Sequence, residues 1–164
     1  MKNIQLIISF FLYNLCFGQL DLNQFNLQFQ SNPKPILLYF YTDWCAYCKI
    51  QEKEIEQNKT IKTQLENDVY FLKINGESLD NINFLGKLYF AKSTQQKKNN
   101  HSFILHFTEE NEQINYPFWV IINEKQEVIG KYFGLIKNNQ LDEIIYKLKP
   151  IDRITMLESQ DSRQ

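Results

Sequence analysis

The feature of this sequence that most restricts its fold is a pair of cysteines placed directly after an unbroken apolar run. The run is ILLYFY, residues 36–41, and Cys45 and Cys48 follow it in YTDWCAYCK. An apolar run of this length predicts a strand that is covered on both faces. Residues 45–65 contain no Gly or Pro, so we expect one helix to begin at the cysteines. The pair therefore marks the passage from a buried strand into a helix.

This position gives the two cysteines different chemistry. At the start of the helix, the sulfur of Cys45 faces unpaired backbone amides and the positive end of the helix dipole, which favour its thiolate. Cys48 follows about one turn later, so it is within reach of Cys45 but more enclosed. We expect Cys45 to attack an incoming disulfide and Cys48 to resolve the mixed disulfide that forms.

The N-terminal residues have the pattern of a secretory signal peptide. Lys2 precedes an apolar stretch, and the small residue Gly18 follows it. Gln5 and Asn14 interrupt the stretch, which is shorter than the roughly 20 residues of a membrane-spanning helix. We expect cleavage after Gly18, export to the periplasm or secretion, and no membrane span in the mature chain.

Signal cleavage also changes the cysteine content. It removes Cys16 and leaves Cys45 and Cys48 as the cysteines of the mature chain. A bridge between them closes a very short loop, which restrains little of the unfolded chain. Redox chemistry therefore explains the pair better than stability does.

Length and charge limit the remaining possibilities. A chain of 164 residues fits one domain. We expect that domain at residues 19–150, between a signal peptide at 1–18 and a polar tail at 151–164. The net charge of −1 and the pI near 6.1 argue against a nucleic-acid or anionic-membrane partner, because either would require a basic face.

The rest of the sequence predicts a mixed sheet between helices. Apolar spacing favours helices over residues 20–30, 102–108 and 141–148, and Pro150 ends the last of these. It favours strands over residues 69–75, 116–123 and 127–134, and a hairpin over residues 84–90. A strand, a helix and a strand in succession imply a parallel pair with a right-handed crossover. The polar turn at residues 124–126 joins the last two strands as an antiparallel hairpin.

The sequence WCAYCK after an apolar strand, with the dipeptide YP at residues 116–117, resembles the thioredoxin superfamily. In particular it is similar to exported thioredoxin-like proteins and to the C-terminal domain of DsbD-type thiol:disulfide interchange proteins, in which an Asp-Trp pair also precedes the first cysteine. The resemblance implies an α/β fold of three layers, with a central mixed β-sheet flanked by helices. An insertion at about residues 76–115 would precede the strand that carries the cis-proline.

The resemblance also implies roles for individual residues. Cys45 would be the attacking thiol, Cys48 the resolving thiol, and Trp44 a cover beside their disulfide. Pro117 would be the cis-proline facing it, and the backbone of Tyr116 would bind an extended substrate peptide in the manner of a strand. The expected function is that of an exported thiol:disulfide oxidoreductase acting on protein disulfides, as a monomer, with a membrane thiol-transfer protein as its electron donor.

Two positions depart from the family pattern. Tyr39 stands at the strand position where many thioredoxins hold a buried aspartate that serves the resolving cysteine. Glu52 can replace that proton acceptor, because Cys48, Glu52 and Ile55 share one side of the expected helix. Glu52 is equally compatible with a solvated place in the charged sequence QEKEIE.

The dipeptide between the cysteines is the second departure. Ala46 and Tyr47 offer no cation to stabilise the thiolate of Cys45. Lys49 supports that thiolate and Asp43 opposes it. The reduction potential is therefore expected nearer the thioredoxin value, about −270 mV, than the DsbA value, about −120 mV, which favours a reductase over a disulfide oxidase or isomerase.

Other functions of a C-x-x-C pair fit less well. His101 and His106 could complete a zinc site, but they lie much further from Cys48 than the roughly 12–15 residues of a compact finger. Covalent haem would require His in place of Lys49. We therefore expect neither metal nor cofactor.

A binding module that uses the fold only to hold partners remains an alternative, and it would keep its partner when both cysteines are replaced. Trp119, inside an expected strand, is interpreted as a core residue.

Overall fold

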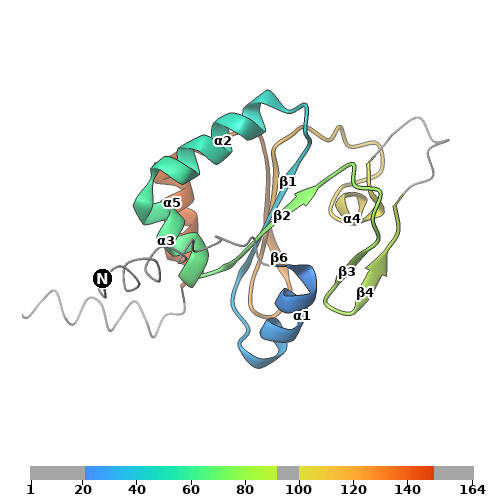
Figure 1. Ribbon diagram of the computed structural model, residues 1–164, viewed down its shortest axis with the longest axis horizontal. Helices are drawn as coiled ribbons and strands as arrows, with labels where there is room; N and C mark the ends of the chain where they lie inside the picture. The colour runs from blue at the N-terminus through green and yellow to red at the C-terminus, as the bar shows by residue number, and fades with distance from the viewer. Residues whose placement is uncertain (1–20, 92–99, 150–164) are drawn as a thin grey trace, which may run out of the picture.

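The structure is a computed structural model that describes residues 21–91 and 100–149. The predicted signal peptide and the polar tail lie outside the described residues. The described helices are α1 (Leu22–Ser31), α2 (Ala46–Gln57), α3 (Lys59–Asn67), α4 (Ser102–Leu105) and α5 (Asn138–Leu148). The strands are β1 (Ile36–Tyr41), β2 (Tyr70–Asn75), β3 (Ile82–Phe84), β4 (Lys87–Tyr89), β5 (Phe118–Ile122) and β6 (Val128–Phe133) (Figure 1).

The central sheet has four strands in the order β2-β1-β5-β6. β1 pairs with β2 in parallel, with α2 and α3 between them in the chain, and with β5 antiparallel. β5 and β6 form the antiparallel hairpin that the turn at residues 124–126 predicts. The mixed sheet of the expected fold class is therefore confirmed.

Helices and a second hairpin cover the two faces of this sheet. α2, α3 and α5 lie on one face, while α1, α4 and the β3–β4 hairpin lie on the other (Figure 1). Successive residues of β1 point to opposite layers: Leu37 and Tyr39 pack with α2, α3 and α5, whereas Leu38 and Phe40 pack with the other layer. The continuous apolar run of β1 is explained by this double burial.

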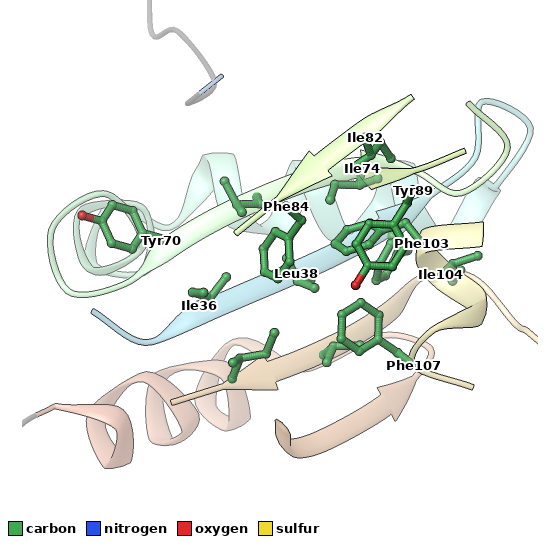
Figure 2. Packing of buried hydrophobic residues seen from close by; sticks show 14 of the residues in the cluster. Ile36, Leu38, Tyr70, Ile74, Ile82, Phe84, Tyr89, Phe103, Ile104 and Phe107 are labelled. Carbon is green, nitrogen blue, oxygen red and sulfur yellow. The ribbon is translucent and has the colours of Figure 1, made fainter. Parts of the chain in front are cut away.

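The segment expected as an insertion contributes directly to the core. Ile82, Phe84 and Tyr89 from the β3–β4 hairpin and Phe103 from α4 are buried beside β1 (Figure 2). The ring of Phe84 also stacks on Phe25 of α1 at a centroid distance of 5.5 Å. The hairpin begins two residues earlier than the expected 84–90, because Ile82 pairs with Tyr89.

Two expectations about helices are wrong. Residues 45–65 form two helices rather than one, because Asn58 has an extended backbone and its side chain accepts a hydrogen bond from the amide of Ile61, which starts α3. The helix expected at 102–108 ends at Leu105. Beyond it the amides of Phe107 and Thr108 bond to carbonyls three residues back, which continues the chain as turns.

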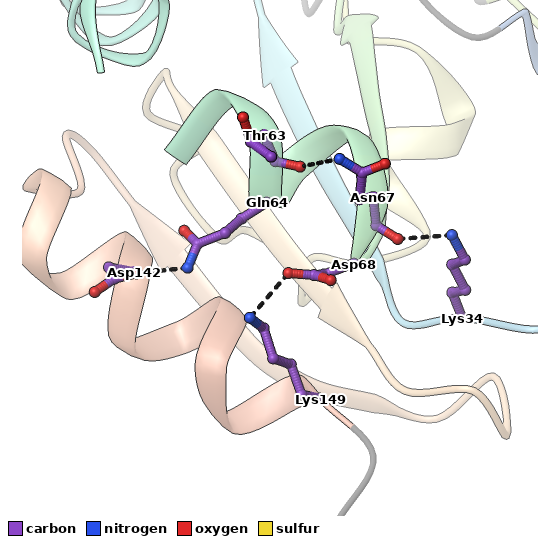
Figure 3. Close-up of polar contacts among 7 residues, drawn as sticks. All are labelled: Lys34, Thr63, Gln64, Asn67, Asp68, Asp142 and Lys149. Atoms are coloured by element: carbon purple, nitrogen blue, oxygen red, sulfur yellow. Dashed lines mark hydrogen bonds and ion pairs between the residues drawn. The ribbon is translucent and has the colours of Figure 1, made fainter. Parts of the chain in front are cut away.

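Polar contacts at the C-terminal end of α3 hold neighbouring segments in place. Asp68 forms an ion pair with Lys149 after α5 at 3.0 Å, and Gln64 donates a hydrogen bond to Asp142 of α5 (Figure 3). Lys34, in the linker before β1, donates to the carbonyl of Asn67 at 2.7 Å. These contacts fix α5 and the start of β1 against α3, the helix that follows the one bearing the cysteines.

Candidate active site

Cys45 and Cys48 form a disulfide at the start of α2, with their Cα atoms 5.3 Å apart. Cys45 is the N-cap of the helix, and its sulfur accepts a hydrogen bond from the amide of Cys48 at 3.0 Å. Cys45 is 4% exposed and Cys48 is 1% exposed. The first cysteine therefore occupies the helix position at which amides and dipole stabilise a thiolate, and the second is the more enclosed of the two.

Pro117 lies at the same end of the sheet as the disulfide. It directly precedes β5, whose first residue, Phe118, pairs with Phe40 near the end of β1. The Tyr116–Pro117 peptide bond is cis, and the carbonyl of Pro117 accepts a hydrogen bond from Gly134 at 2.7 Å. The ring of Tyr116 packs against the core cluster that contains both cysteines.

Trp44 is the most exposed large side chain among the predicted site residues, with 67% of its surface accessible. Its ring meets that of Tyr116 edge to face at a centroid distance of 6.0 Å. The indole N–H donates to a carboxylate oxygen of Glu77 at 3.0 Å. The structure therefore brings Trp44, Tyr116, Pro117 and the two cysteines to one end of the molecule.

Gly76 and Glu77 belong to this site although sequence reasoning did not select them. A Cβ at Gly76 would lie 2.7 Å from Cε1 of Tyr116, so the ring of Tyr116 can approach only because residue 76 is glycine. A glycine directly after a strand is a sign of such a close approach, and Gly76 follows β2. Glu77 and Trp44 are 33 residues apart in the sequence, so no local sequence pattern indicates their hydrogen bond.

Tyr39 lies behind the second cysteine, on the face of β1 that packs against α2. Its hydroxyl donates a hydrogen bond to the carbonyl of Cys48 at 3.1 Å, and its ring meets Trp119 edge to face at 4.6 Å. Burial raises the pKa of Tyr39 well above its usual range, and the charge of Glu52 raises it further. The hydroxyl therefore stays protonated as a donor. Trp119 is fully buried, which confirms its interpretation as a core residue.

Glu52 lies on α2, one turn after Cys48, with 36% of its side chain exposed. Its carboxylate forms an ion pair with Lys73 of β2 at 2.8 Å. The ammonium group of Lys73 also lies 5.3 Å from the centre of the Tyr41 ring. Glu52 is thus ion-paired and partly accessible to solvent. Its negative charge contributes to the raised pKa of Tyr39.

The two histidines lie in the layer formed by α4 and the β3–β4 hairpin. His101 is buried and caps α4: its Nδ1 accepts from the amide of Phe103, so its Nε2 carries the proton and donates to the carbonyl of Asp80. His106 packs against the ring of Tyr89. Within the described residues, no group of three or more His, Cys, Asp or Glu side chains is placed to hold a metal ion.

No helix in residues 21–91 and 100–149 is both long enough and apolar enough to cross a bilayer.

Comparisons with known proteins agree with this architecture. The family model described as a thioredoxin-like domain matches residues 26–149. Among solved structures, Deadhead, a germline-specific thioredoxin of Drosophila melanogaster, has 15% identity and a TM-score of 0.51, over 80% of this chain and 97% of its own. A thioredoxin of Thermus thermophilus has 13% identity and a TM-score of 0.50, over 74% and 78%. Both likenesses show the fold.

The C-terminal domain of DsbD from Neisseria meningitidis, in its reduced form, has 13% identity and a TM-score of 0.48, over 76% of this chain and 90% of its own. A comparison with curated proteins found no match. A thioredoxin-like domain with a bridged C-x-x-C pair is a thiol:disulfide oxidoreductase with protein substrates. The match begins within α1 and extends past the end of α5, and the chain belongs to the thioredoxin-like domain family.

Proposed function

We propose that this chain is an exported enzyme that reduces protein disulfides through a cycle of Cys45 and Cys48. The observation that carries the proposal is the placement of Cys45 at the N-cap of α2, where its sulfur accepts the amide of Cys48. That amide and the helix dipole favour the attacking thiolate. The reductive direction rests on Ala46 and Tyr47, which add no cation to stabilise the reduced form further.

The reaction proceeds by two thiol–disulfide exchanges. The thiolate of Cys45 attacks one sulfur of the substrate disulfide, which forms a mixed disulfide and releases the other substrate sulfur as a thiolate. The thiolate of Cys48 then attacks the sulfur of Cys45, which closes the bridge and releases the second substrate thiolate. The substrate gains two electrons, and the enzyme is left oxidised. A reduced donor must restore it, and we propose a membrane thiol-transfer protein for that role.

Cys48 must lose its proton before it can attack. The hydroxyl of Tyr39 cannot accept this proton, because it is itself protonated and donates to the carbonyl of Cys48. Glu52, one turn further along α2 and partly exposed, is the acceptor we propose. Its ion pair with Lys73 orients the carboxylate, and its exposure allows the proton to pass to solvent.

Trp44, Tyr116 and Pro117 form the proposed substrate surface. An extended substrate segment would bind along the backbone of Tyr116, next to the start of β5, by strand-like hydrogen bonds. The exposed ring of Trp44 would cover the bound segment beside Cys45. This arrangement supports protein disulfides over small-molecule disulfides as substrates, because it offers a backbone edge and an apolar ring together.

Turnover of a protein disulfide tests the proposal. Residues 19–164 would be assayed with insulin as substrate and dithiothreitol as donor, together with Cys45→Ser, Cys48→Ser and the double variant. We expect no turnover from any variant, and a trapped mixed disulfide from Cys48→Ser alone. Turnover by Cys45→Ser would refute the assigned nucleophile. Retention of a partner by the double variant, with no wild-type turnover, would instead indicate a binding module.

Export has its own test. The full chain would be expressed in a bacterium with an outer membrane, and the N-terminus of the recovered protein would be identified by mass spectrometry. We expect a periplasmic protein that begins at Gln19. A protein that keeps Met1 and stays in the cytoplasm would refute export and leave the exchange chemistry untouched.

A further inference from the structure

The segment between β2 and α4 leaves and returns beside the active site. It departs at Gly76, directly after β2, and comes back at Asn100 and His101. The amide of His101 donates to the carbonyl of Gly76 at 2.8 Å, which closes the base of the segment. Both ends therefore lie where the ring of Tyr116 meets Gly76.

The returning end provides a polar partner for Tyr116. The hydroxyl of Tyr116 donates a hydrogen bond to Oδ1 of Asn100 at 2.8 Å. Burial raises the pKa of this hydroxyl well above its usual range, and the charge of Glu77 adds to the effect, so the group remains a donor. The Asn100 oxygen thus satisfies a phenol that is largely withdrawn from water.

The departing end provides a polar partner for Trp44. Glu77, next to Gly76, accepts the indole N–H, while the edge of the Tyr116 ring meets the same indole at 6.0 Å. Trp44 is therefore held from two sides. The carboxylate of Glu77 accepts its indole N–H, and its ring contacts the ring of Tyr116, whose hydroxyl is bonded to Asn100. Without these contacts, an indole with 67% of its surface exposed would be free to change rotamer.

We propose that Asn100 is a positioning residue of the active site: by fixing the hydroxyl of Tyr116, it sets the place of the Tyr116 backbone and of Trp44, and so the affinity for a protein disulfide. The proposal rests on the proposed function, since it assigns a substrate surface to that reaction. Asn100 touches neither cysteine, and it acts through Tyr116. The segment between β2 and α4, whose β3–β4 hairpin contributes to the core, would thereby also tune substrate binding.

A positioning role predicts a change in affinity without a change in chemistry. In Asn100→Ala, the KM for insulin should rise about fivefold, which is the ratio expected for one lost hydrogen bond. The kcat should stay within about twofold of the wild-type value, and the reduction potential should not change beyond experimental error. Asn100→Asp keeps an acceptor oxygen at the same place and should restore the wild-type KM. Asn115→Ala, an exposed asparagine in the same loop as Tyr116, is the matched control and should behave as wild type.

A second measurement does not depend on turnover. The chain has 2 tryptophans, so a ¹⁵N-labelled sample gives two indole signals. The Trp44 signal should shift in Asn100→Ala and in Tyr116→Phe, which removes only the hydroxyl, and the double variant should show no further shift. The signal of buried Trp119 should stay in place in all three.

The outcomes separate the two proposals. If the wild type fails to reduce insulin, the proposed function is wrong, and the indole signals alone decide the role of Asn100. If the wild type is active but Asn100→Ala keeps both its KM and its Trp44 signal, the role of Asn100 is refuted. It is refuted equally if Asn100→Asp behaves like Asn100→Ala, or if Asn115→Ala raises KM to the same extent.

Discussion

The hydroxyl of Tyr39 donates a hydrogen bond to the carbonyl of Cys48, 3.1 Å away, from the centre of the buried strand β1. A protonated phenol thus stands where many thioredoxins hold a carboxylate. It ties the first turn of α2 to the sheet, but it cannot take the proton of the resolving thiol. We propose that the structural and the proton-accepting roles are separated in this chain, with Glu52, which is partly exposed to solvent, as the proton acceptor.

Replacing Tyr39 by Phe should lower the free energy of unfolding by about 1 kcal/mol, because one buried hydrogen bond is lost while the aromatic packing remains. Urea unfolding of the oxidised protein would measure the change. Tyr41→Phe, a partly buried neighbour on the same strand, is the control. Equal stability of wild type and Tyr39→Phe would contradict the role of this hydrogen bond.

Alkaline pH should destabilise the protein through Tyr39 and Tyr116. Burial raises the pKa of both hydroxyls, so above the unfolded value of about 10 the unfolded chain releases its protons first. Stability is therefore lost as pH rises beyond about 10. The free energy of unfolding, measured across this range, should fall less steeply with pH in Tyr39→Phe than in the wild type. Parallel losses in the two proteins would show that Tyr39 does not contribute.

Gln51 should be required for the stability of α2. Its fully buried amide donates to the carbonyl of Ile136 at 3.0 Å and accepts from the Ile136 amide at 2.8 Å. Gln51→Ala leaves both backbone groups without these partners, which should cost about 3 kcal/mol. Gln57→Ala, at the exposed end of the same helix, should change stability by less than about 0.5 kcal/mol. A decrease in the free energy of unfolding of less than about 1 kcal/mol in Gln51→Ala would show that the two hydrogen bonds between Gln51 and Ile136 are dispensable.

His101 should make the protein less stable in mild acid. Burial lowers the pKa of His101 despite its bond to the Asp80 carbonyl, and burial and Lys87 lower that of His106. Below the unfolded value of about 6.5 the unfolded chain binds more protons, so stability falls as pH drops. Asn can cap α4 without titrating. His101→Asn should therefore lose less stability between about pH 6.5 and 5 than the wild type, keeping only the His106 part of the slope. An unchanged slope would exclude His101.

Local patterns in the sequence were enough to predict the elements that carry the cysteines. The apolar run before Cys45, the absence of Gly and Pro after it, and the turn before β6 each determine a neighbouring element. The break at Asn58 was missed because asparagine is tolerated within a helix and acts as a cap only when the chain turns there. The two helices that meet at Asn58 are held by contacts with distant segments, such as that of Gln64 in α3 with Asp142 in α5, and no local pattern encodes these contacts.

The surroundings of the site were harder to predict because they depend on contacts between distant segments. Glu77 meets Trp44 across 33 residues, and Asn100 meets Tyr116 across 16. Neither residue type is unusual in a polar loop, so only the fold shows that both reach the active site. For Glu52, spacing predicts a place on the side of α2 that carries Cys48, whereas its ion pair with Lys73 depends on β2 and has no local sequence pattern.

The most direct test of the central claim is the reduction potential of the Cys45–Cys48 pair. Residues 19–164 would be equilibrated in graded thiol/disulfide buffers, with trapped thiols and tryptophan emission as independent readouts. We predict a single two-electron transition below about −220 mV, as expected for a reductase that needs a dedicated donor. A transition above about −180 mV would contradict the account and indicate a disulfide oxidase or isomerase.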